Sequence, residues 1–253
     1  MASDRIKKRR LTIGLPNSSH FHICHIYTSS RVSIADNIHR LNAELAGTAA
    51  RLCVVTKTHP VERLQEAYDA GARCFGENRP QEIAAKQPQL PADVEWHLIG
   101  QLQTNKVKLL APFVHTIQSI DSLKLLREIN KHAAAHRRVI NGLLQFHIAQ
   151  EETKSGLSLA EAEEILTAPE FPDLSHVRLT GVMGVATFTS DEAQLRGEFQ
   201  RLHGYFDHLK EAYFAESPAF CDISMGMSGD YALAVAEGST LVRVGSAIFG
   251  SRG

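Results

Sequence analysis

Apolar residues recur at helical spacing from residue 31 onward. Ile34, Ile38, Leu41 and Leu45 fall on one stripe, which predicts an amphipathic helix that Gly47 ends. After it, short apolar and β-branched runs alternate with helical patterns such as VERLQEAYDAG and AEAEEIL. These runs predict strands over residues 52–56, 73–76, 94–99, 115–119, 140–148, 177–183, 219–224 and 240–244.

The predicted strands follow one another at a nearly constant interval. The first four begin 21 residues apart, and so do the last two. Such a step holds one strand, one short helix and two tight loops. Ser158 with Glu161 forms a capping box, and Gly71 and Gly238 stand where helices would end. Eight such units in about 200 residues predict an α/β fold, a (β/α)8 TIM barrel, as a single domain over residues 31–253. An open doubly wound sheet is the alternative, but no G-x-G-x-x-G follows the first predicted strand.

Residues 1–30 do not share this pattern. Five basic residues fall within the first ten positions, and neither an apolar h-region nor a small-residue cleavage site follows them. A secretory signal is therefore not expected. The basic run also fits a nuclear or nucleic-acid patch, and the segment HFHICH has metal-ligand residue types on alternate positions. We expect instead a poorly ordered leader outside the barrel.

Composition and charge exclude several classes of protein. The chain has 253 residues, with 27 Lys+Arg against 28 Asp+Glu and a formal net charge of −1. This balance argues against a nucleic-acid partner bound by phosphate neutralisation. No uninterrupted apolar run approaches ~18 residues, so no membrane span is predicted. The four cysteines lie far apart without a C-x-x-C pair, which is typical of a reduced, cytoplasmic protein.

Two cationic side chains stand at places where a barrel does chemistry. Lys57 directly follows the strand 52–56, and Arg243 lies between two valines in the strand 240–244. The first and last strands of a closed barrel are neighbours, so both residues are expected at the same mouth. Desolvation there would favour a neutral Lys57 amine that can attack a carbonyl, although a solvated loop lysine explains the position equally well. A buried guanidinium such as that of Arg243 needs a partner.

Small and hydroxyl residues follow the last two predicted strands. Ser224 ends the strand 219–224, and a helix is expected to begin near Ser228, while Gly245 and Ser246 follow the strand 240–244. Backbone N–H groups and hydroxyls in such loops form anion sites. A lysine that forms Schiff bases, a cationic donor and a phosphate cup together describe a site for pyridoxal 5′-phosphate.

Three further residues stand at or near strand ends, and each has a structural alternative. Asn78 could hydrogen-bond a ligand or cap the following helix. His97 and Met183 could line the site or be ordinary core residues.

Five blocks of sequence carry a family resemblance. They are VVTKTHP, CFGENRPQE, WHLIGQLQTNK, GLLQFHIAQEETKSG and SMGMSGDYALAVAEGSTLVRVGSAIFG. Together they resemble the YggS/PROSC family of pyridoxal phosphate homeostasis proteins, which is similar to the fold-type III barrel domain of alanine racemase. The resemblance covers about residues 32–253. It implies that Lys57 holds the cofactor as a Schiff base and that Arg243 faces the pyridine nitrogen. It further implies that the phosphate is held by Ser224, Ser228, Gly245 and Ser246, and that the ring is lined by Asn78, His97 and Met183.

Two positions depart from the family pattern. The family usually has an asparagine where this chain has His147, and a proline-containing run where it has Val185, Ala186 and Thr187. Both departures bear on the substrate-facing side of the site and leave the lysine and the phosphate cup intact.

The resemblance implies a carrier that maintains intracellular pyridoxal phosphate and hands it to pyridoxal-phosphate-dependent apoenzymes. A guanidinium can only donate, so the ring nitrogen stays unprotonated and the ring is a weak electron sink. The sequence ends soon after the last predicted strand, and we expect no second catalytic base from a further domain. The alternatives are a racemase of the alanine racemase fold and a Schiff-base aldolase. We expect a monomer or a weak dimer, with no nucleic acid, membrane or metal partner.

Overall fold

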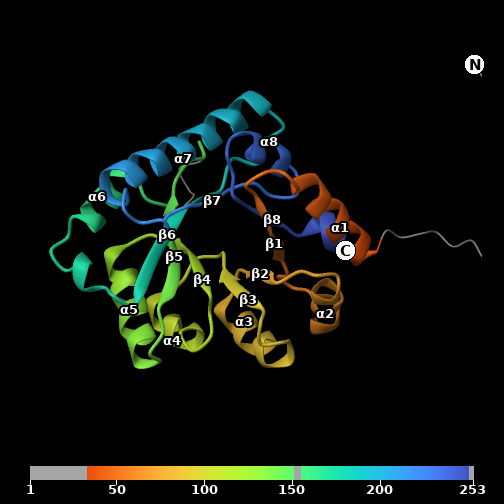
Figure 1. Cartoon of the computed structure of the whole chain (residues 1–253), viewed down its shortest axis with the longest axis horizontal. Coiled ribbons are helices and arrows are strands. Elements are labelled where there is room, and N and C mark those ends of the chain that lie inside the picture. The colour runs from red at the N-terminus through yellow and green to blue at the C-terminus, as the bar shows by residue number, and fades with distance from the viewer. Residues whose placement is uncertain (1–32, 151–154, 251–253) are drawn as a thin grey trace, which may run out of the picture. The chain divides into compact units, whose positions relative to one another are not determined.

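The computed structural model describes residues 33–150 and 155–250. The predicted leader, residues 1–30, lies outside them. Eight parallel strands form one closed barrel in sequence order, β1 to β8 (Figure 1). Their bounds are β1 Arg51–Val55, β2 Cys74–Glu77, β3 Glu95–Leu98, β4 Thr116–Ile120, β5 Ile140–Phe146, β6 Val177–Gly184, β7 Asp222–Ser224 and β8 Leu241–Val244. The predicted (β/α)8 barrel is therefore confirmed.

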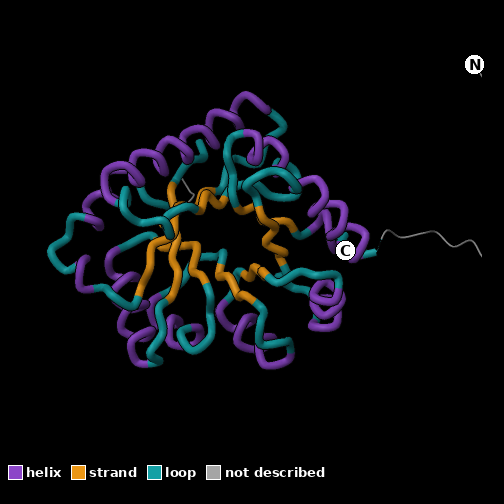
Figure 2. Tube along the Cα trace, viewed as in Figure 1, coloured by secondary structure: helices purple, strands orange, loops and turns teal. Residues whose placement is uncertain are grey.

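Helices surround the strands on the outside, as Figure 2 shows. Their bounds are α1 Ile34–Leu45, α2 Val61–Asp69, α3 Pro80–Lys86, α4 Val107–Leu110, α5 Leu123–Ala135, α6 Leu159–Leu166, α7 Glu192–Tyr213, α8 Tyr231–Ala236 and α9 Ser246–Phe249. Short 3₁₀ turns occupy Gln87–Gln89, Thr104–Lys106 and Phe171–Asp173. Among the described residues, no helix has the length and apolar character that crossing a bilayer requires.

Local signals in the sequence set several helix ends as expected. The four apolar residues of the α1 stripe are buried. Ser158 begins α6 with a capping box, because its hydroxyl accepts from the Glu161 N–H while the Glu161 carboxylate accepts from the Ser158 N–H. Gly71 and Gly238 follow α2 and α8 with φ of +96° and +94°, a conformation that glycine adopts without a Cβ penalty.

Three predicted boundaries differ from the structure by more than one residue. β7 begins at Asp222 rather than at residue 219, because the chain turns where the Phe220 N–H donates to the Ser217 carbonyl. β5 ends at Phe146 because the His147 N–H bonds outside the sheet, to Leu157. The helix expected near Ser228 begins at Tyr231, after a turn closed by bonds to the Met227 carbonyl.

The interior of the barrel is polar on part of its surface. His97 on β3, Gln118 on β4 and Ser224 on β7 are buried and bond to one another across the barrel. Because side chains alternate along a strand, the neighbouring Leu98 and Ile117 face outward, where the helices bury them. The outer face therefore supplies the apolar core, and the inner face can carry chemistry.

Candidate functional site

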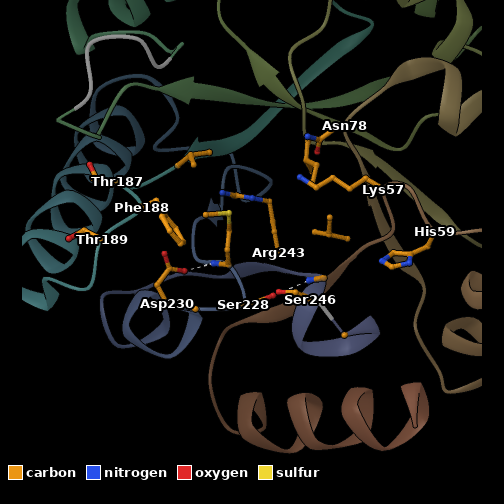
Figure 3. Close-up of a pocket in the computed structure, with 17 residues that line it drawn as sticks. Lys57, His59, Asn78, Thr187, Phe188, Thr189, Ser228, Asp230, Arg243 and Ser246 are labelled. Atoms are coloured by element: carbon orange, nitrogen blue, oxygen red, sulfur yellow. Dashed lines mark hydrogen bonds between the residues drawn. The ribbon is translucent and has the colours of Figure 1, made fainter. Parts of the chain in front are cut away.

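A pocket of about 500 Å³ opens at the carboxyl ends of the strands (Figure 3). Its walls come from the segments that follow β1, β2, β3, β6, β7 and β8. The lining residues are Val55, Lys57, His59, Asn78, Ile99, Val185, Thr187, Phe188, Thr189, Met227, Ser228, Gly229, Asp230, Arg243, Gly245, Ser246 and Gly250. This is the end of the barrel at which enzymes and binding proteins of this architecture place their ligands.

Barrel closure brings the two predicted cations to this pocket. β1 pairs with β8 in parallel, with Cys53 opposite Arg243, and both Lys57 and Arg243 line the cavity. Figure 3 shows both side chains pointing into it. A primary amine and a guanidinium thus face one enclosed volume, although the sequence separates them by nearly the whole barrel.

The backbone on both sides of Lys57 is held by charged side chains. The Lys86 ammonium donates to the Thr56 carbonyl at 3.0 Å and to the Glu77 carboxylate at 2.6 Å. The Thr58 N–H donates to the Glu82 carboxylate at 3.0 Å. Thr58 has a φ of +68°, which is unusual for a β-branched residue and indicates a backbone fixed by its surroundings.

Within this group of side chains, Glu77 is fully buried on β2. Burial raises the pKa of its carboxyl, while the bonds from Lys86 and Thr56 act in the opposite direction. One cation and one hydroxyl therefore support this buried carboxylate. The arrangement joins α3 and β2 to the end of β1 at Thr56, the residue before Lys57.

Arg243 is buried and held by three neutral oxygen acceptors. One terminal nitrogen donates to the Ser224 carbonyl at 2.7 Å and to the Ser224 hydroxyl at 2.6 Å. The other donates to the Gly184 carbonyl at 2.8 Å. Burial lowers the pKa of Arg243 to about 10, so the side chain stays cationic at neutral pH.

The segments after β7 and β8 are tied together by Ser228. Its hydroxyl accepts from the N–H groups of Gly245 at 3.2 Å and Ala247 at 3.3 Å. Asp230 lies on the same wall and accepts from the Met227 N–H. Burial raises the pKa of Asp230, while the Met227 bond and the charge of Arg243 oppose the shift.

Six of the nine predicted site residues line the pocket, and three lie elsewhere. The six are Lys57, Asn78, Ser228, Arg243, Gly245 and Ser246. His97 and Ser224 are fully buried in the barrel interior, where their side chains bond to Gln118. Met183 is buried on β6, in register with Ser224 on β7. None of these three belongs to the described pocket wall.

The pocket also includes residues that the sequence analysis did not select. His59, two residues after Lys57, packs its ring against Phe249 in a tilted arrangement, with a centroid distance of 4.3 Å. Its position in the loop after the first strand was a usable signal. Gln118, which bonds Ser224 from outside the pocket wall, alternates with Thr116 in β4, but polar residues in a strand do not by themselves indicate which partners they bind.

The departures from the family pattern fall partly on the pocket wall. Val185 and Thr187 line it, and Thr187 is fixed because its N–H and hydroxyl donate to the Glu198 carboxylate at 2.6 and 2.7 Å. Phe188 is 96% exposed at the rim. His147 is not part of the described wall. The β6–α7 segment therefore shapes the open side of the pocket.

Comparison with known proteins agrees on one family. The model of the alanine racemase N-terminal domain matches residues 30–253. The pyridoxal phosphate homeostasis protein of Pasteurella multocida is 38% identical over 210 residues, which cover 81% of this chain and 88% of that protein. The protein of the same name from Escherichia coli K12 is 35% identical over 232 residues, 87% of this chain and 97% of that one.

Solved structures give the same result. PipY of Synechococcus elongatus, solved with pyridoxal phosphate bound, is 34% identical with a TM-score of 0.77, over 86% of this chain and 100% of that one. Alanine racemase from Bartonella henselae has a TM-score of 0.64 at 17% identity, over 86% of this chain and 58% of that one. The likeness to the racemase concerns the fold alone.

Proposed function

This chain belongs to the family of pyridoxal phosphate homeostasis proteins, which share the fold of the alanine racemase N-terminal domain, and from that premise we propose that it binds pyridoxal 5′-phosphate reversibly through Lys57. It holds the cofactor in the cytoplasm and releases it to pyridoxal-phosphate-dependent apoenzymes. The observation that carries the proposal is the meeting of Lys57, Arg243 and the Ser228–Ser246 wall in one pocket.

The residues present fit this cofactor. When bound, pyridoxal phosphate supplies an aldehyde that condenses with a primary amine to an imine and water. Lys57 offers the amine, and Arg243 offers donors to the ring nitrogen. The cavity of about 500 Å³ lies within the usual range for small-molecule sites. A Cβ at Gly245 would stand 3.0 Å from the Val55 carbonyl oxygen, so glycine lets the segment after β8 pass close to β1 at the pocket wall.

The phosphate is assigned to the wall formed by Ser228, Gly245 and Ser246. Ser228 accepts from the Gly245 and Ala247 N–H groups, and we propose that a phosphate oxygen, a stronger acceptor than a hydroxyl, takes over these donors. Ser246 adds its own hydroxyl. Asn78 is assigned to the side of the ring. Ser224, His97 and Met183 act from beneath the pocket rather than as part of its wall.

A carrier role follows from the charge placed at the ring nitrogen. Because Arg243 stays protonated and can only donate, it leaves the nitrogen without a proton, and the ring withdraws electrons weakly. This disfavours carbanion chemistry on a bound amino acid. The pocket instead suits reversible capture of a reactive aldehyde.

The first experiment is the visible spectrum of the purified protein with added pyridoxal phosphate, followed by borohydride and peptide mass analysis. We expect a yellow band that borohydride bleaches and a pyridoxyl adduct on Lys57. Lys57→Ala is expected to lose the adduct while keeping the far-UV circular dichroism of the barrel. A colourless protein that cannot be loaded, or an adduct on another lysine, would overturn the proposal.

Release to recipients is tested separately. The loaded protein is mixed with an apoenzyme that needs pyridoxal phosphate, in the presence of an aldehyde scavenger that consumes the free cofactor. We expect recovery of the apoenzyme's activity to exceed that from the same amount of free cofactor. Equal recovery of activity from the loaded protein and from the free cofactor would contradict direct hand-over. The protein would then store the cofactor without delivering it. Sedimentation of the same preparations tests the proposed monomer or weak dimer.

A second candidate is an amino-acid racemase, which the position of His59 favours. Its imidazole lines the pocket together with Lys57, so two groups able to exchange protons face one volume. Racemisation of amino acids that is lost in both Lys57→Ala and His59→Gln would support this candidate. Loss in Lys57→Ala alone would show that His59 is not the second base.

A further inference from the structure

Four buried polar side chains form a continuous chain of hydrogen bonds beneath the pocket. Arg243 donates to the Ser224 hydroxyl oxygen at 2.6 Å. That hydroxyl bonds Gln118 Oε1 at 2.6 Å, and Gln118 Nε2 lies 2.8 Å from His97 Nδ1. Gln118, Ser224 and His97 are fully buried and Arg243 nearly so. The chain crosses the barrel interior from β8 through β7 and β4 to β3.

The charge on Arg243 sets the direction of every bond in this chain. A guanidinium only donates, so the Ser224 oxygen accepts and its own proton goes to Gln118 Oε1. The amide is thereby oriented with its NH2 toward His97, and Nδ1 of His97 accepts. His97 is then the neutral tautomer with its proton on Nε2. Burial, assisted by the charges of His115 and Arg51, holds the pKa of His97 well below its usual range, in agreement with this assignment.

The same tautomer decides a second question. Cys53, Cys74 and His97 place potential metal-ligand atoms close together in the barrel interior. Gln118 engages Nδ1 of His97, so Nε2, which has no hydrogen-bond partner among the described residues, is the nitrogen left to offer a metal its lone pair. In this tautomer Nε2 carries a proton and has no lone pair to offer a metal. We therefore interpret His97 as the last member of the hydrogen-bond chain rather than as a metal ligand.

Arg243 is the only member of the chain that reaches the pocket wall described above. The three bonds to Ser224 and Gly184 engage three of its five N–H groups. Two donors remain for a ligand, on Nη2 and Nε. The direction of these two N–H groups depends on how firmly the Ser224 hydroxyl is oriented. Gln118 orients that hydroxyl by accepting its proton.

We propose that Gln118 is a positioning residue of the cofactor site: through Ser224 it holds Arg243 toward the ring of the bound ligand, and His97 anchors Gln118. This assignment rests on the proposed function for the identity of the ligand. The chain of hydrogen bonds does not depend on the proposed function, because the direction of its bonds follows from Arg243 alone. It assigns His97 and Ser224 a role from the barrel interior, and it adds Gln118, a buried residue that does not line the pocket.

The first test needs no ligand. Histidine side chains are labelled with ¹⁵N, and the His97 signals are assigned by their loss in His97→Asn. Near neutral pH we expect Nε2 protonated and Nδ1 unprotonated. In Gln118→Glu the carboxylate can accept from both neighbours, so the His97 proton is expected to move to Nδ1. A protonated Nδ1 in the wild-type protein, or no change in Gln118→Glu, would overturn the directed chain.

The second test uses pyridoxal phosphate as the probe. Gln118→Met keeps the volume but loses both bonds, and we expect about tenfold weaker binding and a shifted pH titration of the visible band. Gln118→Glu still accepts from Ser224 and is expected to restore affinity to within about threefold of wild type. Ile117→Val, on the opposite face of β4 and equally buried, is expected to lower thermal stability without moving the titration.

A double-mutant cycle separates positioning from general damage. If Gln118 acts through Ser224, adding Gln118→Met to Ser224→Ala has little further effect on affinity. Additive losses, or wild-type affinity and titration in Gln118→Met, would overturn the proposal. A wild-type protein that does not load on Lys57 would instead contradict the proposed function, and the ¹⁵N measurement would still report on the chain. If Gln118→Met does not fold, Gln118→Glu and Ser224→Ala carry the test.

Discussion

At the scale of single residues, the backbone approaches itself closely beside the pocket at Gly100. A Cβ there would lie 2.4 Å from the Asn78 carbonyl oxygen and 2.8 Å from the Asn78 Cα. Both obstacles are backbone, so the segment that carries a pocket residue would have to move. The constraint comes from space rather than from dihedral preference, because Gly100 is not among the glycines with positive φ.

Gly100→Ala therefore tests the link between this approach and the site. We expect a loss of about 1–3 kcal/mol of unfolding free energy from overpacking, together with weaker loading of pyridoxal phosphate as Asn78 is displaced. Urea denaturation and the visible titration measure the two effects. Gly197→Ala is the control for an unobstructed methyl group, since a Cβ there meets nothing within 4 Å; inside α7 it should raise the unfolding free energy by about 0.5–1 kcal/mol. Unchanged stability and loading in Gly100→Ala would contradict the expectation.

At the scale of elements, the buried ion pair between Lys86 and Glu77 joins α3 to β2 and reaches β1 through the Thr56 carbonyl. Glu77 is fully buried and Lys86 nearly so. Removal of one partner from such a pair leaves an uncompensated charge inside the protein. We therefore expect that breaking this pair lowers the unfolding free energy more than breaking the exposed pair Arg40–Glu44 within α1 does.

We expect Lys86→Met to lower the unfolding free energy by about 3 kcal/mol, because the Glu77 carboxylate loses its cation. Addition of Glu77→Gln should recover part of this loss, since a neutral amide needs no counter-charge. Arg40→Met, the exposed control, should cost less than about 1 kcal/mol. Equal losses in Lys86→Met and Arg40→Met by urea denaturation would show that burial of the pair is unimportant.

The capping box of α6 gives a second test at this scale. Ser158→Ala removes the hydroxyl that accepts from the Glu161 N–H, and we expect a loss of about 1 kcal/mol. Glu161→Gln keeps an acceptor for the Ser158 N–H and should cost less. Ser175→Ala, at an exposed serine outside a helix, is the control. Similar losses of unfolding free energy in Ser158→Ala and Ser175→Ala would show that the capping box does not stabilise α6.

At the scale of the whole molecule, closure of the barrel buries a neutral histidine at its centre. Burial holds the pKa of His97 well below 6.5, its value in an open chain. The unfolded protein therefore takes up a proton at this residue at a higher pH than the folded protein does. The stability that results is fully present above about pH 6.5 and is lost as the pH falls.

Between pH 7 and pH 5.5, this single group should cost the wild-type protein about 1 kcal/mol of unfolding free energy. His97→Asn has no imidazole to protonate at this position. The unfolding free energy of the variant should therefore fall less than that of the wild type over the same pH interval, and the difference should equal this cost. Parallel denaturation series at the two pH values measure the difference. Identical pH dependence in both proteins would show that folding does not lower the pKa of His97.

The local sequence was enough to predict most of the elements and six residues of the pocket wall. Alternating and helical apolar patterns located all eight strands, because burial on one side of a strand or helix leaves a periodic trace. The position of Lys57 after β1 and of Arg243 inside β8 was informative for the same reason, since the order of strands in a closed barrel makes them neighbours. The strand ends were less certain where the chain leaves the sheet for a turn, as at Phe220 and His147.

The sequence by itself determined the barrel, the capping box at Ser158 and the two cations of the pocket, because each depends on spacing along the chain or on strand order. Only the tertiary structure decided that Ser224 and His97 are buried in the barrel interior, where both bond to Gln118, and that Lys86 binds the Thr56 carbonyl beside Lys57. The alternation of a strand tells which side chains face inward, but their depth depends on the register of all eight strands. Hydrogen bonds across the barrel join residues that are far apart in sequence, so their partners emerge only when the barrel closes.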